Sequence, residues 1–240
     1  MDGQRVALVT GAASGIGRAA ARAFAHAGYE TVIADINEPE SPEANCRFIR
    51  CDVSDQTAVS ALIAAVVAEH GRLDAAFNNA GVLGELAATG DSDPETFDRV
   101  IAVNLRGTYL CLREELKQMA KQEGGGAIVN CSSVAGLVGL AGAPAYVASK
   151  HGIVGLTRTA ALEYAKANIR VNAICPGPIE TKMLEDLMVG MPREAIVAAE
   201  PVGRIGRPEE IAEAVLWLCS PAASFVTGQA IAADGGWTVQ

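Results

Sequence analysis

The side chains best suited to proton transfer lie close together between Cys131 and Lys150. Tyr146 and Lys150 are four residues apart, and Pro144 suits the first turn of a helix, so the spacing predicts a phenol and an ammonium group on one helix face. A phenol titrates at ~10 in water, but a cation about 4 Å away in a medium of effective dielectric near 20 favours the phenolate by roughly 4 kcal/mol. Such a pair suits acid–base catalysis near neutral pH.

Two hydroxyl groups precede this pair, at the end of an expected buried strand over residues 127–131. Ser132 and Ser133 are both candidate hydrogen-bond donors to a substrate oxygen. No charged residue occurs from Gly124 to Ser149, but repeated Gly, Pro, Ser and Asn favour a strand, a loop and a core helix over a membrane span. Because Tyr/Lys pairs also occur on ordinary solvated helix faces, the catalytic interpretation depends on the rest of the chain.

A glycine-rich turn near the N-terminus indicates a phosphate site. An expected strand over residues 5–10 runs into Gly-Ala-Ala-Ser-Gly-Ile-Gly from Gly11 to Gly17, followed by an Ala-rich helix to about residue 27. Backbone amides at a helix N-terminus bind anions, and glycines let a pyrophosphate approach the backbone. The spacing differs from Gly-x-Gly-x-x-Gly, so the turn alone is a weak signal.

The strand that follows the glycine turn strengthens the prediction of a dinucleotide site. Residues 31–35 end in Asp35, eighteen residues after Gly17, where a carboxylate would hold the ribose 2′-hydroxyl of a dinucleotide. Asp35 would repel a 2′-phosphate, and Ser14 and Ile36 stand where basic residues would otherwise bind one. NAD is therefore expected rather than NADP. A third strand, 48–52, ends at Asp52.

Further strands are expected at 73–77, 169–174 and 229–233, with helices at 55–70, 94–122, 145–166 and 208–219. Asn104 interrupts the apolar stripe of the long helix 94–122, where it predicts a local kink or a bound water. The alternation of strands and helices predicts one α/β domain over residues 1–240, a doubly wound parallel sheet with helices on both faces.

Residues beyond the sixth strand are expected to meet a ligand. Prolines exclude a helix at the start of the segment 175–182, leaving the amide of Ile179 and the hydroxyl of Thr181 available. Residues 183–207 are predicted to form a substrate lid, with three methionines suited to an apolar substrate, at positions 183, 188 and 191.

Composition excludes several classes of partner. The formal net charge of −9 disfavours nucleic acids, anionic membranes and acidic carrier proteins. Six cysteines without a Cys-x-x-Cys pair are expected to be reduced thiols, and three histidines without ligand spacing predict no metal site. Only four apolar residues follow the charged N-terminus, so no signal peptide and a cytoplasmic location are expected.

Taken together, six motifs make the chain resemble the short-chain dehydrogenase/reductase family from end to end. They are Thr10-Gly-x-x-x-Gly-x-Gly17, Asn78-Asn-Ala-Gly81, Asn104, Ser133, Tyr146-x-x-x-Lys150 and Pro176-Gly177. The resemblance implies a Rossmann-type sheet of about seven strands, and it selects Ser133 over Ser132. It implies catalytic roles for Asn104, Ser133, Tyr146 and Lys150, and cofactor contacts for Gly11, Ser14, Ile16, Gly17, Asp35, Asp52, Val53, Asn79, Gly81, Tyr146, Lys150, Pro176, Gly177, Ile179 and Thr181.

The expected activity is an NAD-dependent interconversion of a secondary alcohol and a ketone, with an apolar or cyclic small-molecule substrate. A 3-oxoacyl-carrier-protein reductase and a sugar or polyol dehydrogenase remain alternatives. A non-catalytic dinucleotide-binding protein is disfavoured because the Asn, Ser, Tyr and Lys set is intact. Relatives in this family are usually tetramers, so a homotetramer or homodimer is expected, through helices 94–122 and 145–166 and through the C-terminal strand and tail.

Overall fold

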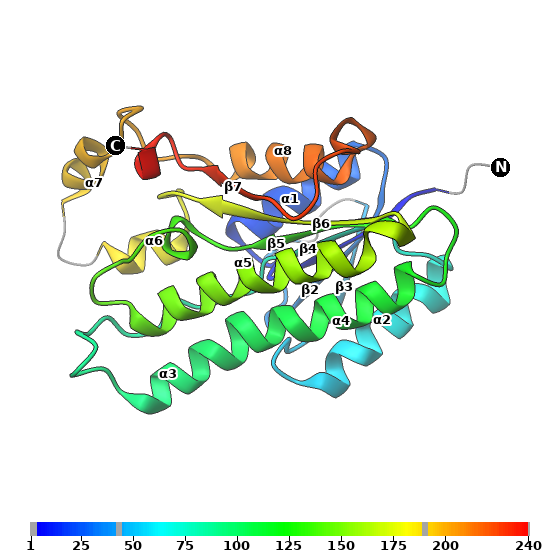
Figure 1. The fold of residues 1–240 in the computed structure, drawn as a ribbon, viewed down its shortest axis with the longest axis horizontal. Coiled ribbons are helices and arrows are strands. Elements are labelled where there is room, and N and C mark those ends of the chain that lie inside the picture. Colours follow the sequence, from blue (N-terminus) through cyan, green and yellow to red (C-terminus); the bar gives the residue numbers. More distant parts are fainter. Residues whose placement is uncertain (1–3, 42–44, 189–191, 240) are drawn as a thin grey trace.

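The computed structural model describes residues 4–41, 45–188 and 192–239. One parallel sheet of seven strands organises this part of the chain, in the order β3-β2-β1-β4-β5-β6-β7 (Figure 1). The strands are β1 (Val6–Thr10), β2 (Glu30–Asp35), β3 (Cys46–Arg50), β4 (Ala75–Asn78), β5 (Gly126–Cys131), β6 (Ile169–Pro176) and β7 (Ala230–Ala233). The predicted doubly wound parallel sheet is confirmed.

Helices cover both faces of the sheet (Figure 1). α1 and α8 pack on one face, whereas α2, α4 and α5 pack on the other. The helices are α1 (Gly15–His26), α2 (Gln56–His70), α3 (Pro94–Val100), α4 (Gly107–Met119), α5 (Pro144–Tyr164), α6 (Lys182–Leu187), α7 (Arg193–Ala199) and α8 (Pro208–Cys219).

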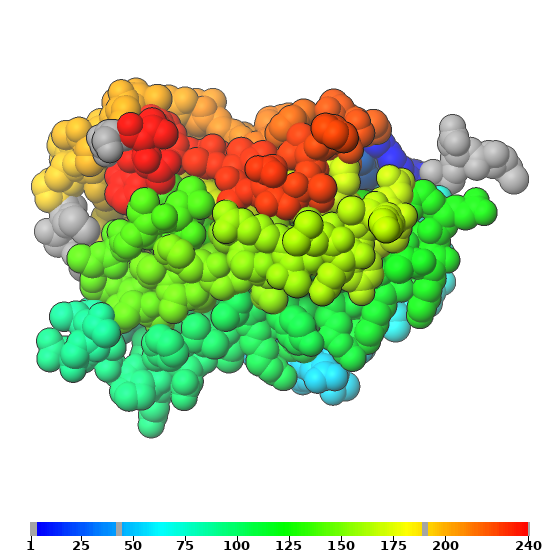
Figure 2. Space-filling view, in the orientation of Figure 1, coloured from blue at the N-terminus to red at the C-terminus, as the bar shows by residue number. Residues whose placement is uncertain are grey.

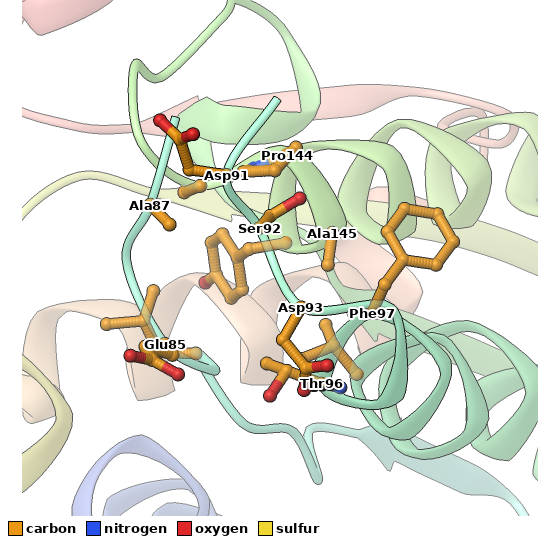
Figure 3. Close-up of a pocket in the computed structure, with 13 residues that line it drawn as sticks. Glu85, Ala87, Asp91, Ser92, Asp93, Thr96, Phe97, Pro144 and Ala145 are labelled. Carbon is orange, nitrogen blue, oxygen red and sulfur yellow. Dashed lines mark hydrogen bonds between the residues drawn. The ribbon is translucent and has the colours of Figure 1, made fainter. Parts of the chain in front are cut away.

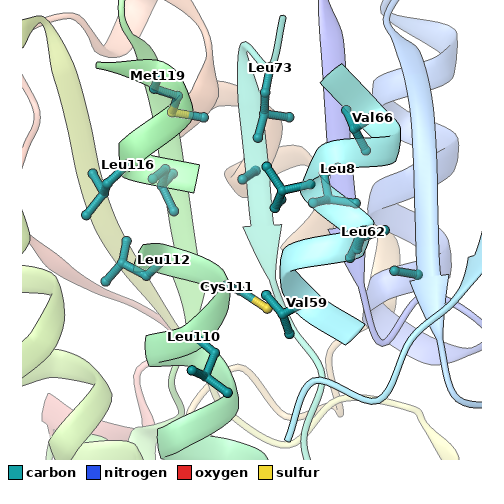
Figure 4. Close-up of a cluster of buried hydrophobic side chains, with 14 of the residues drawn as sticks. Leu8, Val59, Leu62, Val66, Leu73, Leu110, Cys111, Leu112, Leu116 and Met119 are labelled. Carbon is teal, nitrogen blue, oxygen red and sulfur yellow. The ribbon is translucent and has the colours of Figure 1, made fainter. Parts of the chain in front are cut away.

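The core consists of two apolar layers, one on each side of the sheet. Successive side chains of β1 enter opposite layers, so that Leu8 packs beneath α2 and α4 whereas Val9 packs beneath α1 and α8. Figure 4 shows the first layer, with Leu62 of α2 and Leu116 of α4 on either side of Leu73. Each fully buried aliphatic side chain stabilises the folded state by roughly 1.5–3 kcal/mol. The two layers therefore hold the strands in place, and with them the strand ends that carry the functional residues.

Local signals set the helix ends. Asp93 accepts hydrogen bonds from the amides of Glu95 and Thr96 and begins α3, as predicted. Several strand boundaries differ from the sequence prediction. β3 spans Cys46–Arg50 rather than 48–52, so Asp52 follows the strand, β4 spans Ala75–Asn78 rather than 73–77, and β6 continues to Pro176 rather than ending at 174. Pairing with β2 and β1 decides these boundaries, because Cys46 lies opposite Thr31.

The predicted long helix 94–122 is irregular. α3 ends at Val100, a π-helical turn spans Ile101–Arg106, and α4 begins at Gly107. Asn104 lies inside the π turn with no exposed surface. The irregularity expected from a buried amide in an apolar stripe is therefore confirmed, and π turns are often found at functional sites.

The predicted lid 183–207 contains most of α6 and all of α7, and its residues 189–191 lie outside the described residues. Its base is held together by a parallel bridge between Ile179 and Gly206, with hydrogen bonds from the Gly206 amide to Pro178 O (3.0 Å) and from the Glu180 amide to Gly206 O (2.9 Å). In the views of Figures 1 and 2 the lid lies at one end of the molecule, beside the C-terminal tail.

The cysteines and the apolarity of the helices complete the description of the fold. All six cysteines are free thiols, as predicted, and five of them are buried. Among the helices of the described residues, none combines the length and apolarity needed to cross a bilayer.

Candidate active site

The glycine turn and the Asn79 loop meet at the carboxyl ends of β1 and β4, where an open parallel sheet forms its ligand crevice. The Asn79 amide donates to Thr10 Oγ1 (3.0 Å), and Asn79 Nδ2 donates to Gly11 O (3.0 Å). Asn79 therefore fixes the glycine turn against the end of β4, as a cofactor site between these strands requires.

The glycine turn fits a pyrophosphate. Gly11 has φ of +63°, and a Cβ added there would lie 2.6 Å from Ala80 Cα. A Cβ on Gly17 would lie 2.2 Å from Gly11 O. Ser14 precedes α1 without a side-chain cap, and Ile16 is half-buried in its first turn, so the helix begins with amides suited to an anion.

Asp35 ends β2 beside this turn. Its Oδ2 accepts a hydrogen bond from the Ala13 amide (3.0 Å), and its Oδ1 accepts one from the Asn37 amide (3.0 Å). The carboxylate is thus oriented at the edge where an adenosine ribose would lie, with lone pairs left for further donors. Arg50 of β3 also reaches this edge, because its guanidinium donates to Ile36 O.

The two residues predicted near the adenine have different environments. Asp52 is exposed, and its Oδ1 accepts hydrogen bonds from the Ser54 amide (2.9 Å) and hydroxyl (2.7 Å). Val53 is buried and packs against Gly107, where an added Cβ would lie 2.8 Å from Val53 Cγ2. Both follow β3 at the carboxyl edge of the sheet, on the same side as Asp35.

The segment after β6 approaches the same crevice from the other side. Pro176 ends β6, and Gly177 packs so closely on the C-terminal tail that an added Cβ would lie 2.9 Å from Asp234 Cα. Thr181 caps α6, and its hydroxyl donates to Ile179 O (3.2 Å). A Cβ on Gly15 would lie 3.2 Å from Thr181 Cγ2, so this segment and the glycine turn face each other.

Tyr146 and Lys150 share one face of α5, as the sequence predicts. Lys150 Nζ lies 5.3 Å from the centroid of the Tyr146 ring and donates to Cys131 O at the end of β5 (2.8 Å). The Lys150 side chain is buried, so its ammonium group acts in a medium where charges interact more strongly than in water. Gly81 lies next to it, because a Cβ there would be 3.7 Å from Lys150 Nζ.

Asn104 is held by three hydrogen bonds from its side chain. Oδ1 accepts from the Val82 amide (2.8 Å), while Nδ2 donates to Val82 O (2.8 Å) and to Ser149 Oγ (3.2 Å). The Asn104 carbonyl accepts from Thr108 Oγ1 (2.7 Å). Asn104 therefore joins the loop after β4 to the face of α5 that carries Tyr146 and Lys150.

The two serines have different partners. Ser132 is buried, and its hydroxyl donates to Lys150 O (2.9 Å), which ties β5 to α5. Ser133 is half-buried and caps the short 3₁₀ turn Val134–Gly136, where its Oγ accepts from the Ala135 amide (3.1 Å). The hydroxyl hydrogen of Ser133 remains free to donate to a substrate oxygen.

A pocket of about 150 Å³ adjoins Tyr146. Figure 3 shows Glu85 and Ala87 on the loop along one side and Phe97 of α3 on the other. Its lining combines apolar side chains with three carboxylates and three hydroxyls and includes no Lys or Arg, consisting of Leu83, Glu85, Ala87, Asp91, Ser92, Asp93, Thr96, Phe97, Val100, Ala143, Pro144, Ala145 and Tyr146.

Sequence reasoning missed the residues that hold the site together. Val82, Thr108, Ser149 and the carbonyl of Cys131 each bind Asn104 or Lys150. Only Ser149 carried a usable signal, as the one hydroxyl between Tyr146 and Lys150 on the predicted helix.

The parallel sheet, the glycine turn and the Tyr/Lys face define a dinucleotide-binding protein of the Rossmann type. A family model described as "Enoyl-(Acyl carrier protein) reductase" matches residues 11–238. The chain belongs to the short-chain dehydrogenase/reductase family.

Its curated relatives and solved neighbours align over nearly their whole length. Cis-4-hydroxycyclohexanecarboxylate dehydrogenase of Sinomonas cyclohexanicum is 43% identical, covering 98% of this chain and 97% of the relative. The 2,5-dichloro-2,5-cyclohexadiene-1,4-diol dehydrogenase of Sphingobium indicum is 41% identical, covering 96% of each. A crystal structure of levodione reductase superposes with a TM-score of 0.94 at 36% identity, covering 99% of each chain.

Proposed function

We propose that this protein interconverts a secondary alcohol and a ketone by hydride transfer, with NAD as its cofactor and a cyclic or apolar small molecule as its substrate. The observation that carries the proposal is the placement of Tyr146 and Lys150 on one face of α5, next to Gly81 and tied to Asn104 through Ser149. Nicotinamide, when bound, supplies the hydride acceptor for oxidation and the donor for reduction.

The protein's own residues handle the proton and the oxygen. In oxidation, Ser133 and Tyr146 hydrogen-bond the carbinol oxygen, and the phenolate of Tyr146 takes its proton as the hydride leaves the carbon. Lys150 stabilises the phenolate form and holds the nicotinamide ribose. Asn104 keeps a water in the proton path from Lys150 to solvent. Reduction reverses each step, with Tyr146 returning the proton.

NAD is the proposed cofactor because of the environment of Asp35. Its carboxylate is oriented by the amides of Ala13 and Asn37, and a 2′-phosphate next to it would meet like charge. Gly11, Ser14, Ile16 and Gly17 would bind the pyrophosphate, Asp52 and Val53 the adenine, and Asn79 and Gly81 the middle of the cofactor. Pro176, Gly177, Ile179 and Thr181 would meet the nicotinamide carboxamide.

A cyclic or apolar alcohol is the proposed substrate class. The two curated relatives are named for cyclohexane and cyclohexadiene substrates, and the pocket beside Tyr146 offers Leu83, Phe97 and Val100 as apolar contacts beside its carboxylates. The family model is named for an acyl-carrier-protein reductase, but the net charge of −9 disfavours docking of an acidic carrier. Residues 183–207 are the proposed lid over the substrate.

We propose a cytoplasmic homotetramer or homodimer. Exposed apolar side chains on the outer helices support association, since Leu162 of α5 is 84% exposed and Phe225, which follows α8, is 102% exposed. Figure 2 shows α4 and α5 side by side, forming one broad face of the molecule. Six free thiols are consistent with a reducing compartment.

A spectrophotometric screen tests the proposal. Cyclohexanols, cyclic diols, steroids and sugars are assayed with NAD and with NADP in parallel. We expect turnover of cyclic alcohols with NAD. A preference for sugars would move the assignment to the polyol dehydrogenases. A preference for NADP would overturn the role of Asp35.

A further inference from the structure

Ser149 connects two residues that the proposed reaction needs. Its side chain is fully buried on α5, between Tyr146 and Lys150. Ser149 Oγ donates to Tyr146 O (2.7 Å) and accepts from Asn104 Nδ2 (3.2 Å). One hydroxyl group therefore links the backbone of Tyr146 to the side chain of Asn104.

The hydrogen bonds of Ser149 have a fixed direction. Because the single hydroxyl hydrogen is used on Tyr146 O, only the lone pairs of Oγ can face Asn104. Asn104 must then present its N–H to Ser149 and its Oδ1 to the Val82 amide, which fixes the orientation of the Asn104 amide. The two backbone groups of Val82 fix the same orientation, and Ser149 adds the contact that ties the amide to α5.

Among the described residues, no other acceptor takes that N–H. The other hydrogen of Nδ2 is used on Val82 O, and the Asn104 side chain is fully buried. Loss of the Ser149 hydroxyl would leave a buried donor unpaired, which costs roughly 1–3 kcal/mol unless the group moves. Any rotation that relieves it also strains the two bonds to Val82.

The contact between α5 and the π turn is close enough to transmit such a movement. One turn after Ser149, Gly152 packs against Leu105, and a Cβ there would lie 2.7 Å from Leu105 Cδ1. The π turn and α5 therefore form a tightly packed pair, with Ser149 as its polar link. Thr108 Oγ1 holds the Asn104 carbonyl from the far side of the π turn.

We propose that Ser149 is a positioning residue for proton transfer, which keeps Asn104 and the first turn of α5 aligned so that Tyr146 can exchange its proton with solvent. The inference rests on the proposed roles of Tyr146 and Asn104. It predicts that removing the hydroxyl slows the chemical step without weakening cofactor binding.

The test compares Ser149→Ala with Thr157→Val in the full-length protein. Thr157 is a second fully buried hydroxyl on α5, and its Oγ1 accepts from Asn130 Nδ2 in the core (3.0 Å). The two variants thus lose the same kind of buried hydrogen bond on the same helix. The measurements are kcat and KM for alcohol and NAD, kcat as a function of pH, and the midpoint of thermal unfolding.

For Ser149→Ala we expect kcat to fall about tenfold with KM for NAD changed less than about twofold, and the acid limb of the kcat profile to move to higher pH. Thr157→Val is expected to lower the unfolding midpoint while keeping kcat and its pH profile. Unchanged kcat and profile in Ser149→Ala, or equal changes in both variants, would overturn the inference.

Two further controls keep the test decisive. If Ser149→Ala does not fold, Ser149→Cys, with nearly the same shape and a weaker acceptor, replaces it with the same expected loss. If Tyr146→Phe abolishes turnover while Ser149→Ala keeps the wild-type kcat and pH profile, this inference is wrong and the proposed function stands. A wild type inactive on every alcohol screened overturns the proposed function and this inference with it.

Discussion

Replacing Glu115 by Gln is expected to stabilise the protein at alkaline pH. Glu115 lies on α4 with no exposed surface, and its Oε2 accepts from Asn78 Nδ2 (2.8 Å). Asn78 also donates to Asn130 Oδ1 (3.0 Å). Glu115 Oε1 and Asn78 Oδ1 have no hydrogen-bond partner among the described residues. This network has two unpaired acceptors, so a proton on the carboxyl group is favoured there.

The size of the effect follows from burial. Removal from water raises the pKa of Glu115 from 4.5 to about 7, in spite of the hydrogen bond from Asn78, which lowers it. That difference corresponds to about 3 kcal/mol. Because the folded protein holds this proton more tightly than the unfolded chain does, the stabilisation is complete below about pH 4.5. It is lost as the pH rises to about 7 and beyond.

Urea unfolding of the wild type and of Glu115→Gln at about pH 5 and about pH 8.5, at equal protein concentration, measures this directly. The free energy of unfolding of Glu115→Gln, measured relative to that of the wild type, should be about 3 kcal/mol higher at about pH 8.5 than at about pH 5. Glu114→Gln is the matched control, since this neighbour pairs with Lys117 (2.9 Å) near the surface and should show no such gain. A stability difference between Glu115→Gln and wild type that does not change with pH would show that Glu115 does not hold its proton more tightly in the folded protein.

Two other predictions concern the cofactor. Asp35→Ala removes the charge that would repel a 2′-phosphate, so the ratio of kcat/KM for NADP to that for NAD should rise at least about tenfold. An unchanged ratio would exclude Asp35 as the discriminating residue. Gly17→Ala places a Cβ 2.2 Å from Gly11 O and should abolish NAD binding in calorimetric titration. Gly155→Ala on α5, where an added Cβ meets nothing within 4 Å, should bind NAD normally. Equal NAD binding by both variants would contradict the assignment of the glycine turn as the pyrophosphate site.

The fold was largely predictable because each element carries its own signal. Buried strands of Val, Ile and Ala alternate with helical patterns, and Asp93 marks a helix start that the structure confirms. Strand boundaries were less predictable, because pairing decides them. Cys46 extends β3 toward its N-terminus through its partner on β2, and no local pattern reveals that.

The site was predictable where spacing places residues together, as for Tyr146 and Lys150, and where a residue conflicts with its local pattern. Asn104 stood out as an amide inside an apolar stripe, and the structure places a π turn there. Ser149 is marked only by its place between Tyr146 and Lys150, and Glu115 by nothing local, since it follows another glutamate. Their roles arise from contacts with Asn104 and Asn78, which are distant in sequence.

Tyr146 is proposed to carry the proton of the reaction, and Tyr146→Phe removes the group that would carry it. Turnover of a cyclic alcohol is measured beside NADH binding by fluorescence and the unfolding midpoint. We expect kcat to fall about a thousandfold while NADH affinity and stability stay close to wild type. A variant that keeps near-wild-type turnover would contradict it.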